Sequence, residues 1–247
     1  MTAAEAGAGL DLRSAGDAAR TGPRHHEQLP EMVSSYVREL IFTGAVAPGD
    51  FLRTEQVAAE LGVSNTPVRE GLLGLRNEGL VRLVPRRGFV VVPFDRADIH
   101  DLYWGASRLA GKLAARAATS HQEAHIDRAH MSIEQLRSAL ASGDLSSVSA
   151  ASHEFHRQIN LAADSDRLAA MLKSFVDNLP LRLYASIEAQ LGDSLEAHQR
   201  IHEAIVRRDA AAANDLMAEH VLAGADRLIT ALEDRGLWAL GHSTDRP

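Results

Sequence analysis

Short helical patterns separated by turn signals run through the N-terminal third of the chain. Apolar residues recur at helical spacing between Pro30 and Gly44, and Gly44 is a stop signal. The same pattern predicts a short helix over 54–61 and a third helix that begins at Ser64 and closes at Gly79. Two β-branched runs, 81–84 and 89–92, then predict a hairpin. Three helices followed by a hairpin indicate a winged helix-turn-helix.

From Asp95 onward the strand signals disappear and only helical patterns remain. Pro180 is expected to kink or split one of these helices. About six helices are predicted, over 96–118, 122–142, 145–163, 165–190, 193–207 and 210–234. The expected fold class is therefore mainly α, with an N-terminal winged helix-turn-helix followed by an all-helical bundle.

Composition and predicted secondary structure divide the chain into four parts. Residues 1–28 are rich in Ala, Gly and small polar residues and are expected to form a disordered arm. A winged helix-turn-helix domain is predicted over 29–94, an all-helical domain over 95–236, and a flexible tail over 237–247. The sequence shows neither a signal-peptide core nor an apolar run of about 20 residues. We therefore expect a cytoplasmic protein that does not associate with a membrane.

The third predicted helix presents polar side chains where a recognition helix contacts base edges. Arg69 is suited to guanine or phosphate, and Asn65 to adenine. The hairpin tip suits phosphate or minor-groove contact. The residues expected to contact DNA are Arg53, Ser64, Asn65, Thr66, Arg69, Arg86, Arg87 and Gly88.

Charge and composition narrow the function further. The net charge of −7 argues against a protein that coats nucleic acid by bulk charge. However, residues 30–94 carry 7 basic and 7 acidic side chains, whereas 95–247 carry 16 basic and 22 acidic ones, so the acidity belongs mainly to the helical part. The lack of cysteine excludes disulfides, thiolate metal sites and cysteine nucleophiles, and the 12 histidines leave imidazole as the main candidate metal ligand.

Over about 50 residues the first domain resembles the GntR family of bacterial transcription regulators. Two positions depart from the family pattern: Asn65 stands where arginine is common, and Gly71 where alanine is common. Gly71 should cost about 1 kcal/mol of helix propensity. The matching residues are Pro48-Gly49-Asp50, Leu52, Glu55, Val57-Ala58, Leu61-Gly62-Val63-Ser64, Thr66-Pro67-Val68-Arg69-Glu70, Leu72, Leu75, Glu78-Gly79-Leu80-Val81 and Pro85-Arg86-Arg87-Gly88-Phe89.

The second domain resembles the all-helical FCD effector domain of the FadR-like branch of that family. The resemblance nominates His156, His198 and His220 as ligands of a divalent metal of the zinc, nickel or manganese class. Ser152 stands where the family has Asp or Asn, and a neutral hydroxyl is a poorer ligand than a carboxylate. Three imidazoles alone can hold zinc with an open position. A metal-free polar pocket lined by the same histidines is the alternative.

Spacing independently supports part of this site. His198 and His220 each lie 11 residues from Asp209, where a helix break is predicted. If the two helices fold back on each other, both imidazoles lie about 16 Å from the turn and therefore level with each other. His153 and His202 are expected to point elsewhere.

An effector pocket is expected around the histidines, although the family arginine that commonly meets an effector carboxylate is replaced by Ala106. A carboxylate effector is therefore a weaker expectation than a larger or less charged one. Trp104, like Tyr103, is more typical of a helix core than of a pocket. The expected pocket comprises Tyr103, Ala106, Ser152, His156, His198 and His220. Three further histidines, 121, 125 and 130, are interpreted as solvent-facing.

These features together predict a ligand-responsive regulator. It is expected to act as a repressor and homodimer on double-stranded DNA, with a near-palindromic operator whose half-sites lie about 34 Å apart. A small molecule in the helical domain controls DNA affinity in this interpretation. The alternatives are a DNA-binding regulator whose helical domain holds no ligand or metal, and a small metalloenzyme that activates water at the three histidines.

Overall fold

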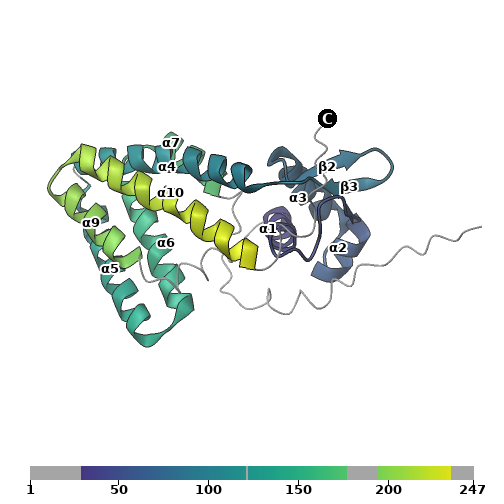
Figure 1. The fold of residues 1–247 in the computed structure, drawn as a ribbon, viewed down its shortest axis with the longest axis horizontal. Coiled ribbons are helices and arrows are strands. Elements are labelled where there is room, and N and C mark those ends of the chain that lie inside the picture. Colours follow the sequence, from purple (N-terminus) through teal and green to yellow (C-terminus); the bar gives the residue numbers. More distant parts are fainter. Residues whose placement is uncertain (1–28, 121, 177–193, 235–247) are drawn as a thin grey trace, which may run out of the picture. The chain divides into compact units, whose positions relative to one another are not determined.

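A computed structural model describes residues 29–120, 122–176 and 194–234. Contacts divide the chain into two compact units, with the boundary between Pro93 and Phe94 (Figure 1). The arm expected over 1–28, the tail expected over 237–247 and the kink expected at Pro180 lie outside the described residues.

The first unit is a winged helix-turn-helix. Its strands form an antiparallel sheet in the order β1-β3-β2, in which Val81 pairs with Val91 and Phe51 with Val90. The predicted helices and hairpin are present, whereas the short strand β1 is an addition that the sequence pattern does not predict. The elements are α1 (Leu29–Phe42), β1 (Phe51–Leu52), α2 (Thr54–Leu61), α3 (Asn65–Asn77), β2 (Val81–Val84) and β3 (Gly88–Val91).

Helix α3 packs against α1 through its apolar face. Val68, Leu72 and Leu75 are fully buried. Near the end of α3, the Arg38 guanidinium of α1 donates hydrogen bonds to both carboxylate oxygens of Glu78, at 2.7 and 2.9 Å from Nη2. This packing fixes the recognition helix on its support and leaves its opposite face exposed.

The second unit consists of helices over the described residues. The predicted segments agree with the observed helices to within a few residues at their ends, except that the helix expected over 165–190 is described only as far as Val176. The elements are α4 (Arg96–Thr119), α5 (Glu123–Ser142), α6 (Leu145–Ala162), α7 (Asp166–Val176), α9 (Ser194–Val206) and α10 (Ala210–Asp234).

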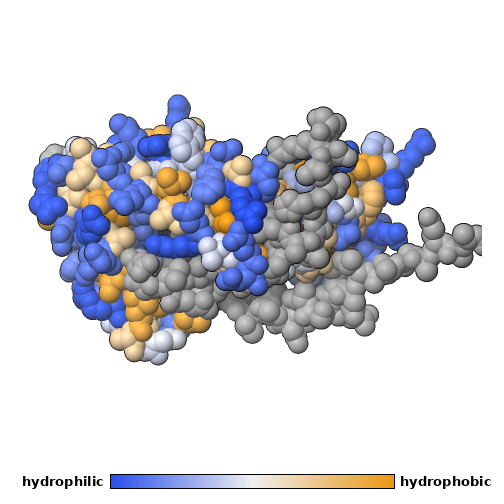
Figure 2. Space-filling view, viewed as in Figure 1, coloured by the Kyte–Doolittle hydropathy of each residue, from blue (hydrophilic) through white to orange (hydrophobic). Residues whose placement is uncertain are grey.

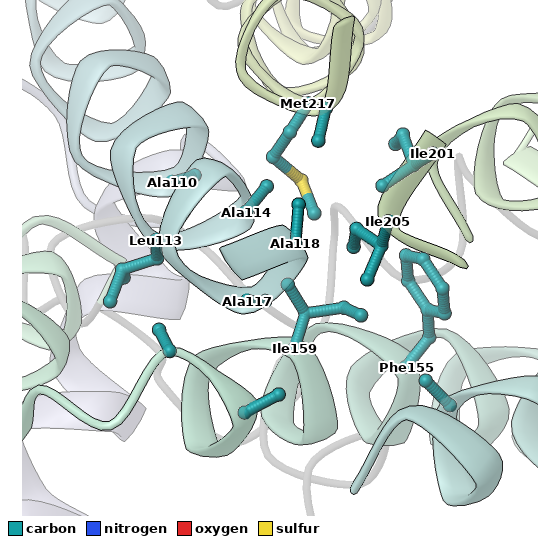
Figure 3. Close-up of a cluster of buried hydrophobic side chains, with 14 of the residues drawn as sticks. Ala110, Leu113, Ala114, Ala117, Ala118, Phe155, Ile159, Ile201, Ile205 and Met217 are labelled. Atoms are coloured by element: carbon teal, nitrogen blue, oxygen red, sulfur yellow. The ribbon is translucent and has the colours of Figure 1, made fainter. Parts of the chain in front are cut away.

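Small residues of α4 allow other helices to pack closely in the core of the second unit. A Cβ on Gly111 would lie 2.7 Å from the backbone oxygen of Asn214 in α10. Figure 3 shows Met217 reaching toward Ala114 and Ala118 of α4. The alanine-rich face of α4 therefore brings α10 into the core.

The visible face of this unit is largely hydrophilic (Figure 2). None of the described helices is both long and apolar enough to cross a membrane.

Two predictions about side-chain environment are wrong. Tyr103 is buried, but Trp104 is 56% exposed, with the Arg108 guanidinium 5.7 Å from its ring centroid. Consecutive helix residues point about 100° apart, so only one of this pair faces the core. His125 is half-buried and its Nδ1 lies 2.7 Å from Oε1 of Gln158, whereas His130 is exposed as expected. His121 lies outside the described residues.

Candidate functional site

The N-terminal turns of α3 present a polar surface. Ser64 occupies the N-cap position, and the side chains of Asn65, Thr66 and Arg69 are exposed, while Val68 points into the core. In the described part of the chain none of these polar side chains forms a hydrogen bond or an ion pair with the protein. They are therefore available to an external partner such as the base edges of DNA.

The hairpin between β2 and β3 presents a second basic surface. Arg86 adopts a left-handed conformation with φ of 62°, and Gly88 follows with φ of 99°. The guanidinium of Arg87 lies 4.5 Å from the ring centroid of Phe51. This contact ties the hairpin tip to β1, a link that the local sequence pattern did not reveal. Arg53, just before α2, is also exposed.

Three imidazoles from three helices converge in the second unit. His198 of α9 and His220 of α10 place their Nε2 atoms 3.2 Å apart. His156 of α6 places its Nε2 3.3 Å from that of His220. One candidate ligand atom from each ring lies within 4.8 Å of the others. The prediction that His198 and His220 lie level across the helix pair is confirmed.

The surroundings of this cluster keep the imidazoles of His198 and His220 neutral. His198 is fully buried and stacks on the ring of Phe155, with centroids 4.1 Å apart. Burial, reinforced by neighbouring His156, lowers the pKa of His198 well below its ordinary value and that of His220 to about 3. Neutral imidazole is the form that binds a metal.

Two of the three donor-atom separations fit a tetrahedral metal ion. Metal–nitrogen bonds of about 2.05 Å at tetrahedral angles place two nitrogen ligands about 3.3 Å apart. The two Nε2 separations, 3.2 and 3.3 Å, agree with this value. In the described part of the chain, Nδ1 of His198 and Nδ1 of His220 have no hydrogen-bond partner, so the outer hydrogen bonds that usually orient metal-bound histidines are missing there.

Three other residues near the cluster, Ser152, His153 and His202, are further candidates for metal ligands. Ser152 is buried one turn before His156. His153 is exposed, with its Nδ1 2.8 Å from the backbone oxygen of Ser149, and His202 contacts the backbone oxygen of Ile126. The prediction that His153 and His202 point away from the cluster is therefore confirmed.

The proposed effector pocket stays a prediction. Tyr103 and Ala106 are buried on α4, and Ala106 belongs to the hydrophobic core. Two cavities in this unit, one beside α5 and α9 and one beside α5 and α6, are lined by other residues.

Comparison with known proteins agrees with the domain type predicted for each of the two units. Residues 29–91 match the model for bacterial regulatory proteins of the gntR family, and residues 101–223 match the FCD domain. The chain is 29% identical to a probable D-xylose utilization operon transcriptional repressor of Paenarthrobacter nicotinovorans over 77% of this chain and 86% of that protein. It is 30% identical to an uncharacterized helix-turn-helix-type transcriptional regulator of Agrobacterium vitis over 50% of this chain and 74% of that protein.

A solved structure has the same fold. The Escherichia coli protein McbR/YncC matches with a TM-score of 0.62 and 23% identity, over 85% of this chain and 99% of that chain. The match supports the arrangement of a winged helix-turn-helix followed by a helical domain. The chain belongs to the GntR family of bacterial regulatory proteins, and it is a DNA-binding transcriptional regulator with an FCD domain rather than an enzyme.

Proposed function

We propose that this regulator is a repressor whose operator affinity is controlled by a small molecule bound at a divalent metal in its helical domain. The observation that carries the proposal is the convergence of Nε2 atoms from His156, His198 and His220 at separations suited to one metal ion. Repression is supported by the name of the Paenarthrobacter relative.

Recognition of the operator is assigned to the exposed side chains at the start of α3. Asn65 reads adenine and Arg69 reads guanine, while Arg53, Arg86 and Arg87 contact the phosphate backbone. A homodimer presents two such surfaces to half-sites about 34 Å apart on a near-palindromic operator. Since the first unit carries equal numbers of basic and acidic side chains, weak non-specific affinity and dependence on dimer geometry are expected.

The ligand set indicates which metals bind. Three neutral imidazoles without a carboxylate favour zinc or nickel over manganese, which prefers oxygen ligands. Ser152 contributes no charge. A bound metal supplies a Lewis-acidic position to which an oxygen of the effector binds. Ala106 stands where the family has a basic side chain and offers no positive charge to a carboxylate, so a larger or less charged effector is expected.

Control of DNA binding follows from a difference in effector affinity. The effector binds one arrangement of the dimer better than the other and shifts the population toward it. A difference of about 1–3 kcal/mol is typical of such coupling and changes operator affinity by roughly 5- to 150-fold.

The metal proposal is tested on purified full-length protein stripped with EDTA and reloaded with zinc or nickel. His198→Ala should lose metal retention and keep operator binding in fluorescence anisotropy at fixed salt, because His198 is in the other unit from α3. His153→Ala is the matched control, since this exposed histidine faces away from the cluster. Metal content that is equal in wild type and His198→Ala by elemental analysis contradicts the proposal and favours a metal-free pocket.

A further inference from the structure

A cavity separate from the histidine cluster lies in the second unit. It has a volume of about 550 Å³ and lies among the C-terminal end of α4, the first half of α5 and the end of α9. None of the three clustered imidazoles lines it. It is large enough for a small organic molecule.

The lining of this cavity includes both buried and exposed apolar side chains. Ile126 and Ile205 are buried in the core, whereas Met131 is 59% and Val206 57% exposed. They are among the most exposed large hydrophobic side chains in the described part of the chain. Their apolar surface at the mouth is available to cover the apolar part of a ligand.

Several polar side chains of the described cavity lining already make hydrogen bonds within the protein. Nη2 of Arg208 donates to Oε1 of Glu123 at 3.2 Å, and Oγ of Ser120 donates to the backbone oxygen of Ala117 at 3.0 Å. Nε2 of His202 lies 3.3 Å from the backbone oxygen of Ile126. A carbonyl oxygen only accepts, so this Nε2 carries the proton and Nδ1 of His202 is left as an acceptor.

A carboxylate adds negative charge to these acceptors. Asp127 is exposed and forms no hydrogen bond or ion pair within the described residues. Beside it the rings of His130 and His202 lie 5.2 Å apart at 33°. Burial and then the neighbouring His130 lower the pKa of His202, so its imidazole is neutral near pH 7. The lining is therefore rich in acceptors and, since Glu123 is paired with Arg208, carries the net charge of Asp127.

We propose that this cavity is a second ligand site that binds a small amphipathic organic cation. A primary ammonium group donates to the carboxylate of Asp127, and the apolar body of the ligand lies against Met131, Val206 and the imidazole faces. An organic anion is disfavoured because Asp127 repels it and the positive charge of Arg208 is balanced by Glu123, 3.2 Å away. This site is independent of the metal proposed at the histidine cluster.

The test is calorimetric titration of full-length protein with 2-phenylethylamine, with 2-phenylethanol and 3-phenylpropanoate as uncharged and anionic analogues. The amine should bind, and the alcohol and the acid should bind at least tenfold more weakly. Asp127→Asn should weaken amine binding about tenfold through the loss of a charge-assisted hydrogen bond. Met131→Ser should weaken it about fourfold through the loss of apolar contact.

Asp101→Asn is the matched control because Asp101 is exposed on α4 and does not line the cavity. It should leave amine affinity unchanged, as should EDTA, which separates this site from the metal site. Absence of amine binding at millimolar concentration overturns the proposal. So does equal binding of the alcohol, or equal amine affinity in Asp127→Asn and wild type.

Discussion

Replacing Gly71 with alanine should destabilise the first unit, although alanine is the better helix former. In isolation, the exchange should stabilise α3 by about 1 kcal/mol. The structure places α1 against this position: a Cβ on Gly71 would lie 2.7 Å from the backbone oxygen of Pro30 and 2.9 Å from two side-chain carbons of Val33. Oγ of Ser34 also donates a hydrogen bond to the backbone oxygen of Gly71 at 3.0 Å and holds the helices at this distance.

The size of the effect follows from the overlap. Non-bonded carbon atoms are most stable about 3.5–4.0 Å apart, so α1 must move away by roughly 0.5–1 Å. The atoms that Cβ meets are a backbone oxygen and the first carbons of Val33, which cannot rotate away. Overpacking of this kind costs about 1–3 kcal/mol. After subtraction of the gain in propensity of about 1 kcal/mol, a net loss of up to about 2 kcal/mol is expected.

Amide hydrogen exchange read by mass spectrometry suits this measurement. The described residues of the first unit, 29–93, contain no tryptophan, so tryptophan fluorescence does not report on this unit directly. In Gly71→Ala, peptides from α1 and α3 should exchange faster than in wild type, by up to about 30-fold. Peptides from the second unit should be unchanged and provide an internal reference.

The same helix offers a matched control. A Cβ on Gly74 would lie 3.4 Å from Oγ of Ser34, an ordinary contact. Gly74→Ala should therefore slow exchange in α3, since propensity acts there without a clash. If both variants stabilise the unit, or if both destabilise it equally, the argument from close packing at Gly71 is refuted.

Two further predictions concern the surface of α3 and the histidine cluster. Arg69→Ala should weaken operator binding by about 1–3 kcal/mol. Arg76→Ala, at the other end of α3, should have a smaller effect. Equal losses of affinity in anisotropy titrations of the two variants would contradict base reading by Arg69. In metal-free protein, the pKa of His198 is lowered and that of His220 is about 3. A histidine in the unfolded chain has a pKa near 6.5. The unfolded state therefore binds more protons than the folded state between these pH values. Stability should fall as pH drops from about 6.5 toward 3, by up to about 1.4 kcal/mol per pH unit for each imidazole, and His220→Asn should show a shallower slope in urea unfolding.

The parts of the first unit that could be predicted from the sequence are those determined by local signals. Helix α2 ends where Gly62 takes φ of 67°, and Gly79, with φ of 81°, follows α3, as their sequence positions indicated. Strand β1 could not be predicted because it consists of two residues that pair with β3 about 40 positions later. For Gly71 the local sequence indicates only helix propensity, because the contact of this residue with Val33 depends on how two helices pack.

The histidine cluster was predictable to the extent that its geometry is local. His198 and His220 are equidistant from one tight helix connection, where Arg208 adopts φ of 59°, and the antiparallel pair brings them level. The position of His156 depends on how α6 packs against these helices, so only the resemblance to the FCD domain nominated it. Packing also decided the environments of Trp104 and His125, which the sequence assigned wrongly. Two histidines at equal distances on either side of a turn between antiparallel helices therefore predict a contact between their side chains. The periodicity of a single helix cannot predict such a contact.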